Sequence, residues 1–226
     1  MMDHLWMLKV VCRSMYVKDK KQFNLVHSIQ ELKKMDTGLN RLFDSYEVNN
    51  LKPEKDYFKA LTRSIIYQQL SGKAARVIFE RFKVVFSGSS FPSPKDILDT
   101  DIQKFRSSGI SFRKSQYIRN IAQAFLDDQV TYLNLEKIDD NEIIEALTKV
   151  KGIGLWTAQM FLMFTLNRPD IFPATDLAMQ KGYQNYFKLN ELPKPASMIA
   201  MSQKWTPYRT TVSLYLWAVL EGPFEW

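Results

Sequence analysis

Apolar side chains recur at three- and four-residue intervals along most of this chain, which is the spacing of one face of an α-helix. The stretch 57–67 is the clearest case, because Phe58, Leu61 and Ile65 fall on one side of a helix. The alternation of apolar and polar residues that is typical of half-buried strands is nearly absent. The pattern therefore predicts an all-α fold.

Glycines, prolines and polar runs separate the segments that have this helical spacing. The polar turn at 68–72 and the loop at 87–94 are the clearest separators. Residues 1–22 lack the spacing and are interpreted as an N-terminal arm of unknown role. The predicted helices cover residues 26–32, 39–46, 57–67, 74–85, 94–99, 113–126, 141–148, 155–166, 177–187, 195–201 and 208–220.

The composition of the chain narrows its class and its partners. It has 226 residues and 46% hydrophobic content, which is enough to bury a sizeable core. Lys and Arg outnumber Asp and Glu by 31 to 24, giving a net charge of +7. Such a balance favours a polyanionic partner, either nucleic acid or an anionic membrane surface.

The N-terminus and the cysteine count indicate an intracellular, reducing compartment. With Asp3 and Lys9 near its short apolar stretch, the N-terminus makes a poor signal peptide. Apolar runs approaching the ~20 residues of a membrane span are absent, so we expect no membrane partner. The single cysteine, Cys12, excludes a disulfide framework and any zinc or iron–sulfur site made of cysteines alone.

Two glycines, Gly152 and Gly154, flank Ile153 between two predicted helices. Glycines permit positive φ and close approach of the backbone to a ligand, so the amides that open the second helix can point at a phosphate. Such a contact would bind phosphate without sequence preference. Taken alone, the two glycines are more typical of ordinary helix termination than of a phosphate site.

An acidic residue follows at the start of the next predicted helix. Thr175 suits an N-cap, which places Asp176 in the first turn, where the helix dipole favours a negative charge. By itself, such an acid is also compatible with a favourable surface charge and no chemistry.

Four segments, in this order and spacing, resemble the helix-hairpin-helix (HhH-GPD) DNA glycosylase superfamily, and most closely its 3-methyladenine DNA glycosylase II branch. The resemblance covers nearly all of the chain after the N-terminal arm. The segments are 66–75 (Ile-Tyr-Gln-Gln-Leu-Ser-Gly-Lys-Ala-Ala), 109–118 with its Gly-Ile-Ser-Phe-Arg-Lys, 152–176 from Gly-Ile-Gly to Phe-Pro-Ala-Thr-Asp, and 205–217 from Trp-Thr-Pro-Tyr-Arg to Leu-Trp.

The resemblance implies a compact glycosylase domain at 23–226, with two helical lobes and the hairpin at the mouth of a central cleft. Lobe one spans about 57–168, and lobe two combines about 23–56 with 169–226. It further implies base excision repair on double-stranded DNA that contains alkylated bases of the 3-methyladenine or 7-methylguanine type. We expect the protein to act as a monomer in the cytoplasm or nucleoid, or in the nucleus of a eukaryote.

By the same resemblance, Asp176 is the catalytic carboxylate that stabilises the oxocarbenium-like sugar as the N-glycosidic bond breaks. Trp156 stands where glycosylases with lyase activity have a Schiff-base lysine, so the chain is expected to be monofunctional. The implied base pocket consists of Trp156, Trp217, Met160 and Leu177, although Trp217 is equally typical of core packing. Relatives often have aromatic residues at the last two positions, which leaves the breadth of the substrate range open.

The implied DNA contacts lie in two groups. Leu70, with Gln69 and Ser71 beside it, is the expected wedge that fills the place of the flipped base. The expected phosphate contacts are Lys151, Gly152, Ile153, Gly154, Arg113, Lys114 and Lys181, although each charged side chain also suits a solvated surface. We expect no cofactor and no iron–sulfur cluster, and the carbonyls of Val150 and Gly152 as the place where a structural Na⁺ or K⁺ ion could bind.

Two other functions remain compatible with the sequence. A DNA-damage-binding module of the same fold could have lost catalysis, and a bifunctional glycosylase-lyase would act on other lesions. Asp176 favours an enzyme over the module, and Trp156 disfavours the lyase.

Overall fold

The computed structural model describes residues 23–86, 91–127 and 135–222, so the predicted N-terminal arm at 1–22 lies outside the described residues. Every regular element in these ranges is helical, which confirms the all-α prediction. The α-helices are α2 (Leu25–Met35), α3 (Asn40–Ser45), α4 (Tyr57–Tyr67), α5 (Gly72–Val84), α6 (Pro94–Asp99), α7 (Ile102–Ser107), α8 (Phe112–Leu126), α9 (Asp140–Thr148), α10 (Leu155–Phe164), α11 (Leu177–Phe187), α12 (Pro195–Ser202) and α13 (Arg209–Glu221). Short 3-10 turns are η2 (Thr37–Leu39), η3 (Leu135–Lys137) and η4 (Gln203–Trp205).

Polar side chains that cap the helices fix most of their beginnings. Asp56 accepts a hydrogen bond from the Lys59 amide at the start of α4, and Ser111 does the same for Lys114 at the start of α8. Because Ser71 caps α5, that helix begins two residues before the predicted start. The helix α7 was not predicted, since its six residues are too few for a clear apolar period.

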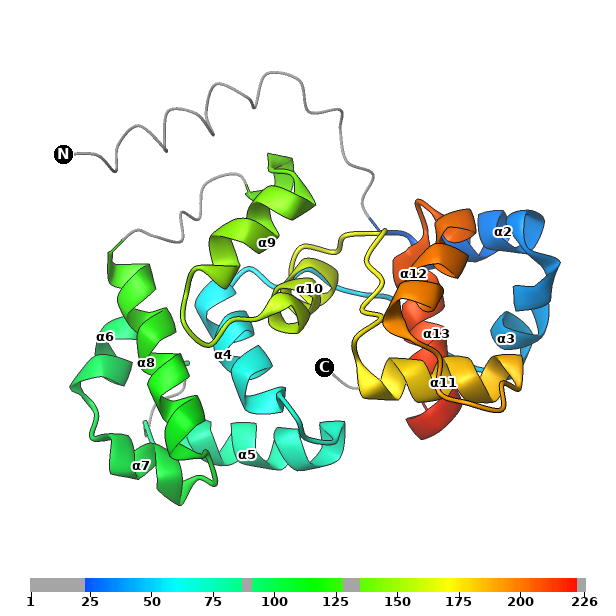
Figure 1. Ribbon diagram of the computed structural model, residues 1–226. Helices are drawn as coiled ribbons and strands as arrows, with labels where there is room; N and C mark the ends of the chain where they lie inside the picture. Colours follow the sequence, from blue (N-terminus) through cyan, green and yellow to red (C-terminus); the bar gives the residue numbers. More distant parts are fainter. Residues whose placement is uncertain (1–22, 87–90, 128–134, 223–226) are drawn as a thin grey trace.

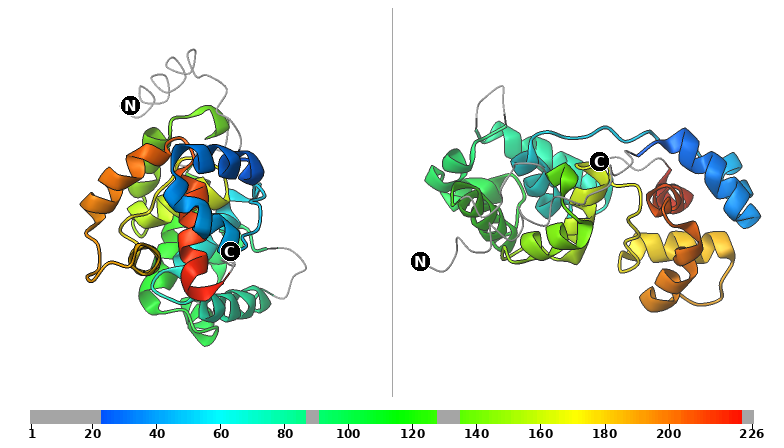
Figure 2. Two further views of the ribbon diagram at one scale, coloured as in Figure 1. Left: turned by 90° about the vertical axis from the view of Figure 1, so that its right-hand side faces the viewer. Right: turned by 90° about the horizontal axis from the view of Figure 1, so that it is seen from above.

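The helices form two groups that lie side by side. Figure 1 shows α4 to α10 in one group and α2, α3, α11, α12 and α13 in the other, and the view from above in Figure 2 agrees. We call the first group lobe one and the second lobe two. The chain crosses between them along 46–56 and again along 165–176. None of the helices in the described ranges is both long and apolar enough to cross a membrane.

Each lobe has an aromatic core. In lobe one, Phe82 packs against Phe86 and Phe105. In lobe two, the fully buried Trp205 stacks on Phe187, with ring centroids 6.2 Å apart. Packing within each core fixes the helix ends that face the other lobe.

The close packing of α11 on α13 depends on Gly182. A Cβ atom at this position would clash with the main-chain carbonyl of Leu216, so only glycine permits the two helices to approach this closely. The neighbouring residue on α13 is Trp217. The contact between α11 and α13 therefore brings the Trp217 side chain close to the beginning of α11.

Candidate active site

Asp176 is the N-cap of α11, not a residue of its first turn as the sequence predicted. Its backbone is extended, and its Oδ1 accepts a hydrogen bond from the Met179 amide at 2.7 Å. Thr175 is therefore not the cap. The prediction failed because Asp and Thr are both good caps and the sequence alone did not fix the register.

Two tryptophan side chains hold the Asp176 carboxylate from different lobes. The Trp156 indole of α10 donates to Oδ2 at 2.7 Å, and the Trp217 indole of α13 donates to Oδ1 at 3.0 Å. Together with the Met179 amide, three neutral donors fix the carboxylate. Within the part of the chain that the structure describes, no basic side chain forms an ion pair with Asp176. Its hydrogen-bond partners there are therefore neutral, and no ion pair competes with an incoming cationic group.

The turn at 150–154, which we call the hairpin, joins α9 to α10 and places Trp156 in the first turn of α10. Gly152 has a φ of +114°, and a Cβ there would clash with the Tyr117 ring, so this glycine is required. Gly154 has an ordinary φ of −97° and is exposed, so its backbone conformation does not require glycine. No side chain caps α10, which leaves its first amides available to an anion.

The four residues predicted to form the base pocket do not share one surface. Trp156 is half-buried and Leu177 is exposed, and both lie next to Asp176. Met160 is fully buried and Trp217 is 3% exposed, so neither presents a free surface to a base. For Trp217 the reason is that its indole binds Asp176 while its ring stacks on Phe164. In this structure Met160 is therefore not part of an open pocket surface, and Trp217 has no exposed ring face on which a base could stack.

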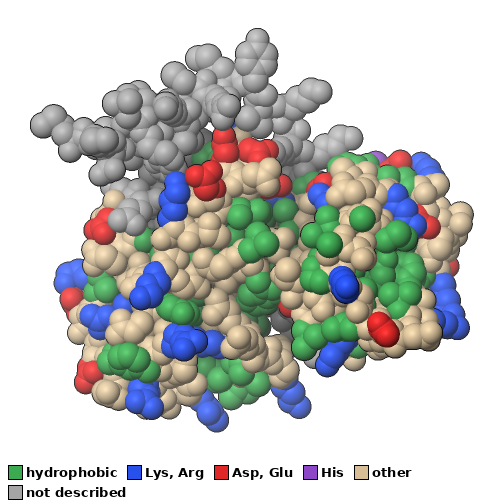
Figure 3. Space-filling view, viewed as in Figure 1, with side chains coloured by type: hydrophobic (Ala, Val, Ile, Leu, Met, Phe, Trp, Pro, Cys, Tyr) green, Lys and Arg blue, Asp and Glu red, His purple; other side chains and the backbone are tan. Residues whose placement is uncertain are grey.

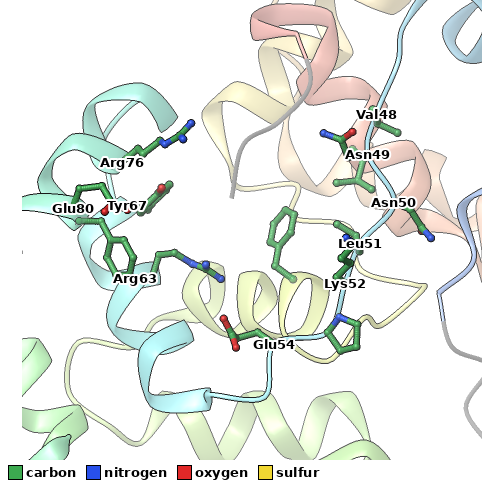
Figure 4. A pocket seen from close by; sticks show the side chains of 14 residues that line it. Val48, Asn49, Asn50, Leu51, Lys52, Glu54, Arg63, Tyr67, Arg76 and Glu80 are labelled. Carbon is green, nitrogen blue, oxygen red and sulfur yellow. The ribbon is translucent and has the colours of Figure 1, made fainter. Parts of the chain in front are cut away.

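A cavity of about 600 Å³ lies between the lobes, and Phe164, whose ring stacks on Trp217, is part of its lining. Figure 4 shows Arg63, Tyr67 and Arg76 pointing into it from α4 and α5, opposite the linker of residues 48–54. Phe164 of α10 and Leu214 of α13 complete the lining. The furrow between the lobes is visible in Figure 3, with basic side chains on its flanks. The sequence analysis missed these lining residues, because nothing in the helical period distinguishes them from core.

The predicted wedge residues form the turn between α4 and α5. Leu70 is 40% exposed, and Gln69 has a φ of +57°, which is uncommon for a residue other than glycine. Ser71 caps α5 through its side chain. Leu70 is thus presented at the surface on a strained turn, as a protruding apolar side chain.

Three of the predicted phosphate-binding side chains are exposed, and one is not available. Arg113, Lys151 and Lys181 lie at the surface. Lys114 instead donates to the main-chain oxygens of Ile66 at 2.8 Å and Gln68 at 2.6 Å. Burial lowers the pKa of Lys114. Its prediction as a phosphate contact is therefore corrected to a contact within the protein.

Each of the two carbonyls expected to bind a monovalent cation accepts one hydrogen bond within the protein, which leaves one lone pair on each oxygen. The Gly152 carbonyl already accepts a hydrogen bond from the Gln68 amide at 3.1 Å, and the Val150 carbonyl accepts one from the Ile153 amide at 3.0 Å. Ile153 itself is buried and anchors the hairpin. Within the described ranges, His, Cys, Asp and Glu form no group that could hold a metal ion.

Comparison with known proteins assigns the family. The family model described as "HhH-GPD superfamily base excision DNA repair protein" matches residues 62–207. The DNA-3-methyladenine glycosylase 1 of Schizosaccharomyces pombe is 37% identical over 180 residues, which cover 79% of each chain.

Two solved structures have the same fold. One is the Schizosaccharomyces pombe 3-methyladenine DNA glycosylase in complex with abasic DNA, at a TM-score of 0.78 and 34% identity, covering 85% of this chain and 95% of that one. The other is a DNA-3-methyladenine glycosidase from Bacillus halodurans, at a TM-score of 0.71 and 31% identity, covering 86% and 89%. The chain therefore belongs to the HhH-GPD superfamily of base excision DNA repair proteins.

Proposed function

We propose that this protein is a monofunctional DNA glycosylase, which flips an alkylated base out of double-stranded DNA and hydrolyses its N-glycosidic bond. The observation that carries the proposal is the Asp176 carboxylate, held by three neutral donors beside the hairpin. The names of the relatives, which include 3-methyladenine DNA glycosylases, support alkylated purines as the substrate class.

The chemistry follows from the charge of Asp176. When the bond between C1′ and the base nitrogen breaks, its electron pair stays with the base and positive charge develops on the sugar. An alkylated purine already has a positive charge, and the electron pair that it keeps when the bond breaks makes it neutral. The purine can therefore leave without a proton donor. A fixed carboxylate next to C1′ stabilises the cationic sugar most strongly in the transition state.

Asp176 also has room for the attacking water. A carboxylate offers about four lone-pair positions, and three are taken by Trp156, Trp217 and Met179. One position therefore remains to accept a hydrogen bond from a water molecule, whose oxygen adds to C1′ and whose proton is released to solvent. The reaction as written requires no metal and no redox cofactor.

Trp156 supports a reaction without strand cleavage. A lyase needs an amine that forms a Schiff base with the sugar. The group that approaches Asp176 from the first turn of α10 is an indole, which donates a hydrogen bond and cannot form that bond. We therefore expect an abasic site as the product.

The cavity between the lobes supports binding of a planar base. Tyr67 and Phe164 line it, and aromatic stacking contributes about 1–3 kcal/mol per base. The Phe164 ring also stacks on Trp217, which binds Asp176, so two side chains in contact connect the cavity to the carboxylate. We propose that the flipped base reaches this cavity past Trp156 and Leu177, and that the protein acts as a monomer.

The test is incubation of the purified protein with double-stranded DNA methylated to contain 3-methyladenine and 7-methylguanine. We expect free methylated bases, with strands that stay intact until alkali cleaves the abasic sites. Strand nicking by the protein alone would instead support the bifunctional lyase. Binding of the methylated DNA without release would support the non-catalytic module.

A further inference from the structure

The turn at 68–71, which we call the insertion loop, contains the candidate wedge Leu70. Gln69 adopts a left-handed backbone conformation there, which is strained for a residue other than glycine and persists only where the surroundings impose it. Two polar side chains tie this loop to other elements: Lys114 reaches it from α8, and Gln68 reaches from the loop itself to the hairpin and α10. Neither of them has a part in the chemistry described above.

Lys114 holds the loop from the side of α8. Its ammonium lies 2.8 Å from the Ile66 oxygen and 2.6 Å from the Gln68 oxygen, both at the end of α4. A cation at a helix C-terminus satisfies carbonyls that have no partner within the helix and opposes the negative end of the dipole. Lys114 thus fixes the point at which the chain leaves α4 for the loop.

Gln68 holds the loop from the side of the hairpin. Its side-chain amide donates to the Gly152 oxygen at 3.1 Å and to the Thr157 hydroxyl at 2.9 Å. Gly152 belongs to the hairpin, and the buried Thr157 belongs to α10, directly after Trp156. One amide group therefore joins the insertion loop to the hairpin and to α10.

The same face of α8 supports both loops. Lys114, Tyr117 and Asn120 follow at three-residue intervals, so they lie on one side of the helix. Tyr117 packs under Gly152, and the Asn120 amide donates to the Lys151 oxygen at 2.9 Å. The insertion loop and the hairpin are thus fixed to a common helix as well as to each other.

We propose that Gln68 and Lys114 are positioning residues that hold the insertion loop at a fixed distance from the hairpin, so that Leu70 enters the duplex in register with the phosphate that the hairpin binds. This inference rests on the proposed base-flipping function. Neither side chain touches DNA in this arrangement. Their removal should impair formation of the flipped state and leave the electrostatic part of DNA binding intact.

The experiment uses Gln68→Met and Lys114→Met in the full chain, both of similar length to the native side chains but without donors. Their matched controls are Gln123→Met, whose amide binds Asp127 on the surface of α8, and Lys95→Met, whose ammonium binds Asp99 on α6. Thermal unfolding is measured first. The readouts are then single-turnover release of 3-methyladenine, fluorescence of 2-aminopurine placed next to the lesion as a reporter of flipping, and DNA affinity at several salt concentrations.

We expect both variants to lose release and the fluorescence change by about ten- to a hundredfold, since a small misplacement has effects of this size. The slope of the logarithm of DNA affinity against the logarithm of salt concentration should be the same as for the native protein. Loss of a phosphate contact would lower that slope by about 0.9, so such a change in Lys114→Met would overturn the proposal. Native release rates in both variants would overturn it too. If one variant fails to fold, the other decides alone. Absence of release by the native protein would instead contradict the proposed glycosylase function itself.

Discussion

Asp36 and Asp176 occupy similar local positions in lobe two. Each caps the beginning of a helical segment, and each accepts a hydrogen bond from a tryptophan indole. Asp36 binds the Gly38 amide at 3.1 Å and the Trp205 indole at 2.8 Å. Both carboxylates therefore have the same kind of support, a main-chain amide from the helix start and an indole from a residue remote in sequence.

The difference between them is a lysine. The Lys204 ammonium lies 2.8 Å from Asp36 Oδ2, whereas Asp176 is held by neutral donors only within the described residues. Partial burial acts to raise the pKa of Asp36, but the hydrogen bonds from Lys204 and Trp205 outweigh it and hold that pKa below its usual value. A carboxylate with its own cation serves to join elements of the fold. One without a cation can pair with charge that develops on a substrate.

The largest effect should come from Asp176→Asn. It removes the negative charge and keeps the size and an acceptor for the Met179 amide, so release of 3-methyladenine should fall by about a thousandfold or more while DNA affinity is retained. Single-turnover release and a binding titration measure the two quantities. A variant that keeps most of its activity would contradict the catalytic role.

Removal of an indole donor to Asp176 should have the next largest effect on the rate of base release. Trp156→Phe keeps an aromatic ring but removes one donor that orients the carboxylate. Hydrogen bonds to charged groups contribute about 1.5–3 kcal/mol, which corresponds to about a ten- to hundredfold lower kcat if the contribution is made in the transition state. Steady-state kinetics measure kcat and KM, and an unchanged kcat would argue against orientation by Trp156. The matched change Trp205→Phe, at Asp36, should lower stability and leave kcat near native.

Asp36→Asn should lower the stability of the protein and leave its activity intact, whereas Asp176→Asn should lower activity. It weakens the contacts with Lys204 and Trp205, so the free energy of unfolding should fall by about 1–3 kcal/mol. Release of methylated base per folded molecule should stay native. Urea unfolding and release assays on the same preparation measure both. Loss of activity with full stability would show that the two carboxylates do not divide their roles in this way.

The pH dependence of stability should give the smallest effect. Because the pKa of Asp36 is lowered on folding, its stabilising contribution is present above the unfolded value of about 3.9 and is lost as the pH falls through the folded value. The difference in unfolding free energy between native protein and Asp36→Asn should therefore be constant from pH 7 to about 5 and shrink below about 4. Urea titrations across this range test it, and a difference that persists unchanged at pH 3 would refute it.

The sequence predicted the helices well where an amphipathic period and a polar cap coincide. The helix α4 shows both, with a buried apolar face behind Asp56, and its predicted bounds match the observed ones. The sequence predicted helix bounds less well where a helix is short, or where two neighbouring residues are both good N-caps. The helix α7 was missed, and Asp176 was placed one position inside the helix that it caps.

Side-chain roles were harder to predict than helices. Lys114 and Trp217 belong to residue types that bind phosphates and stack on bases, and the motif that contains them favoured those roles. In the structure, Lys114 meets the end of α4 and Trp217 meets Asp176. Both partners are remote in sequence, so the helical period and the motif spacing hold no information about these contacts.

By itself, the sequence determined the helical class, the hairpin and the presence of one aspartate at a helix start, because periodicity, glycine and capping act over a few neighbouring residues. Only the tertiary structure decided what that aspartate can do. The approach of α11 to α13 at Gly182 and the position of α10 bring two indoles to Asp176, and no lysine of the described ranges pairs with it. Such an environment depends on how helices from two lobes pack, and packing joins residues that the chain keeps far apart.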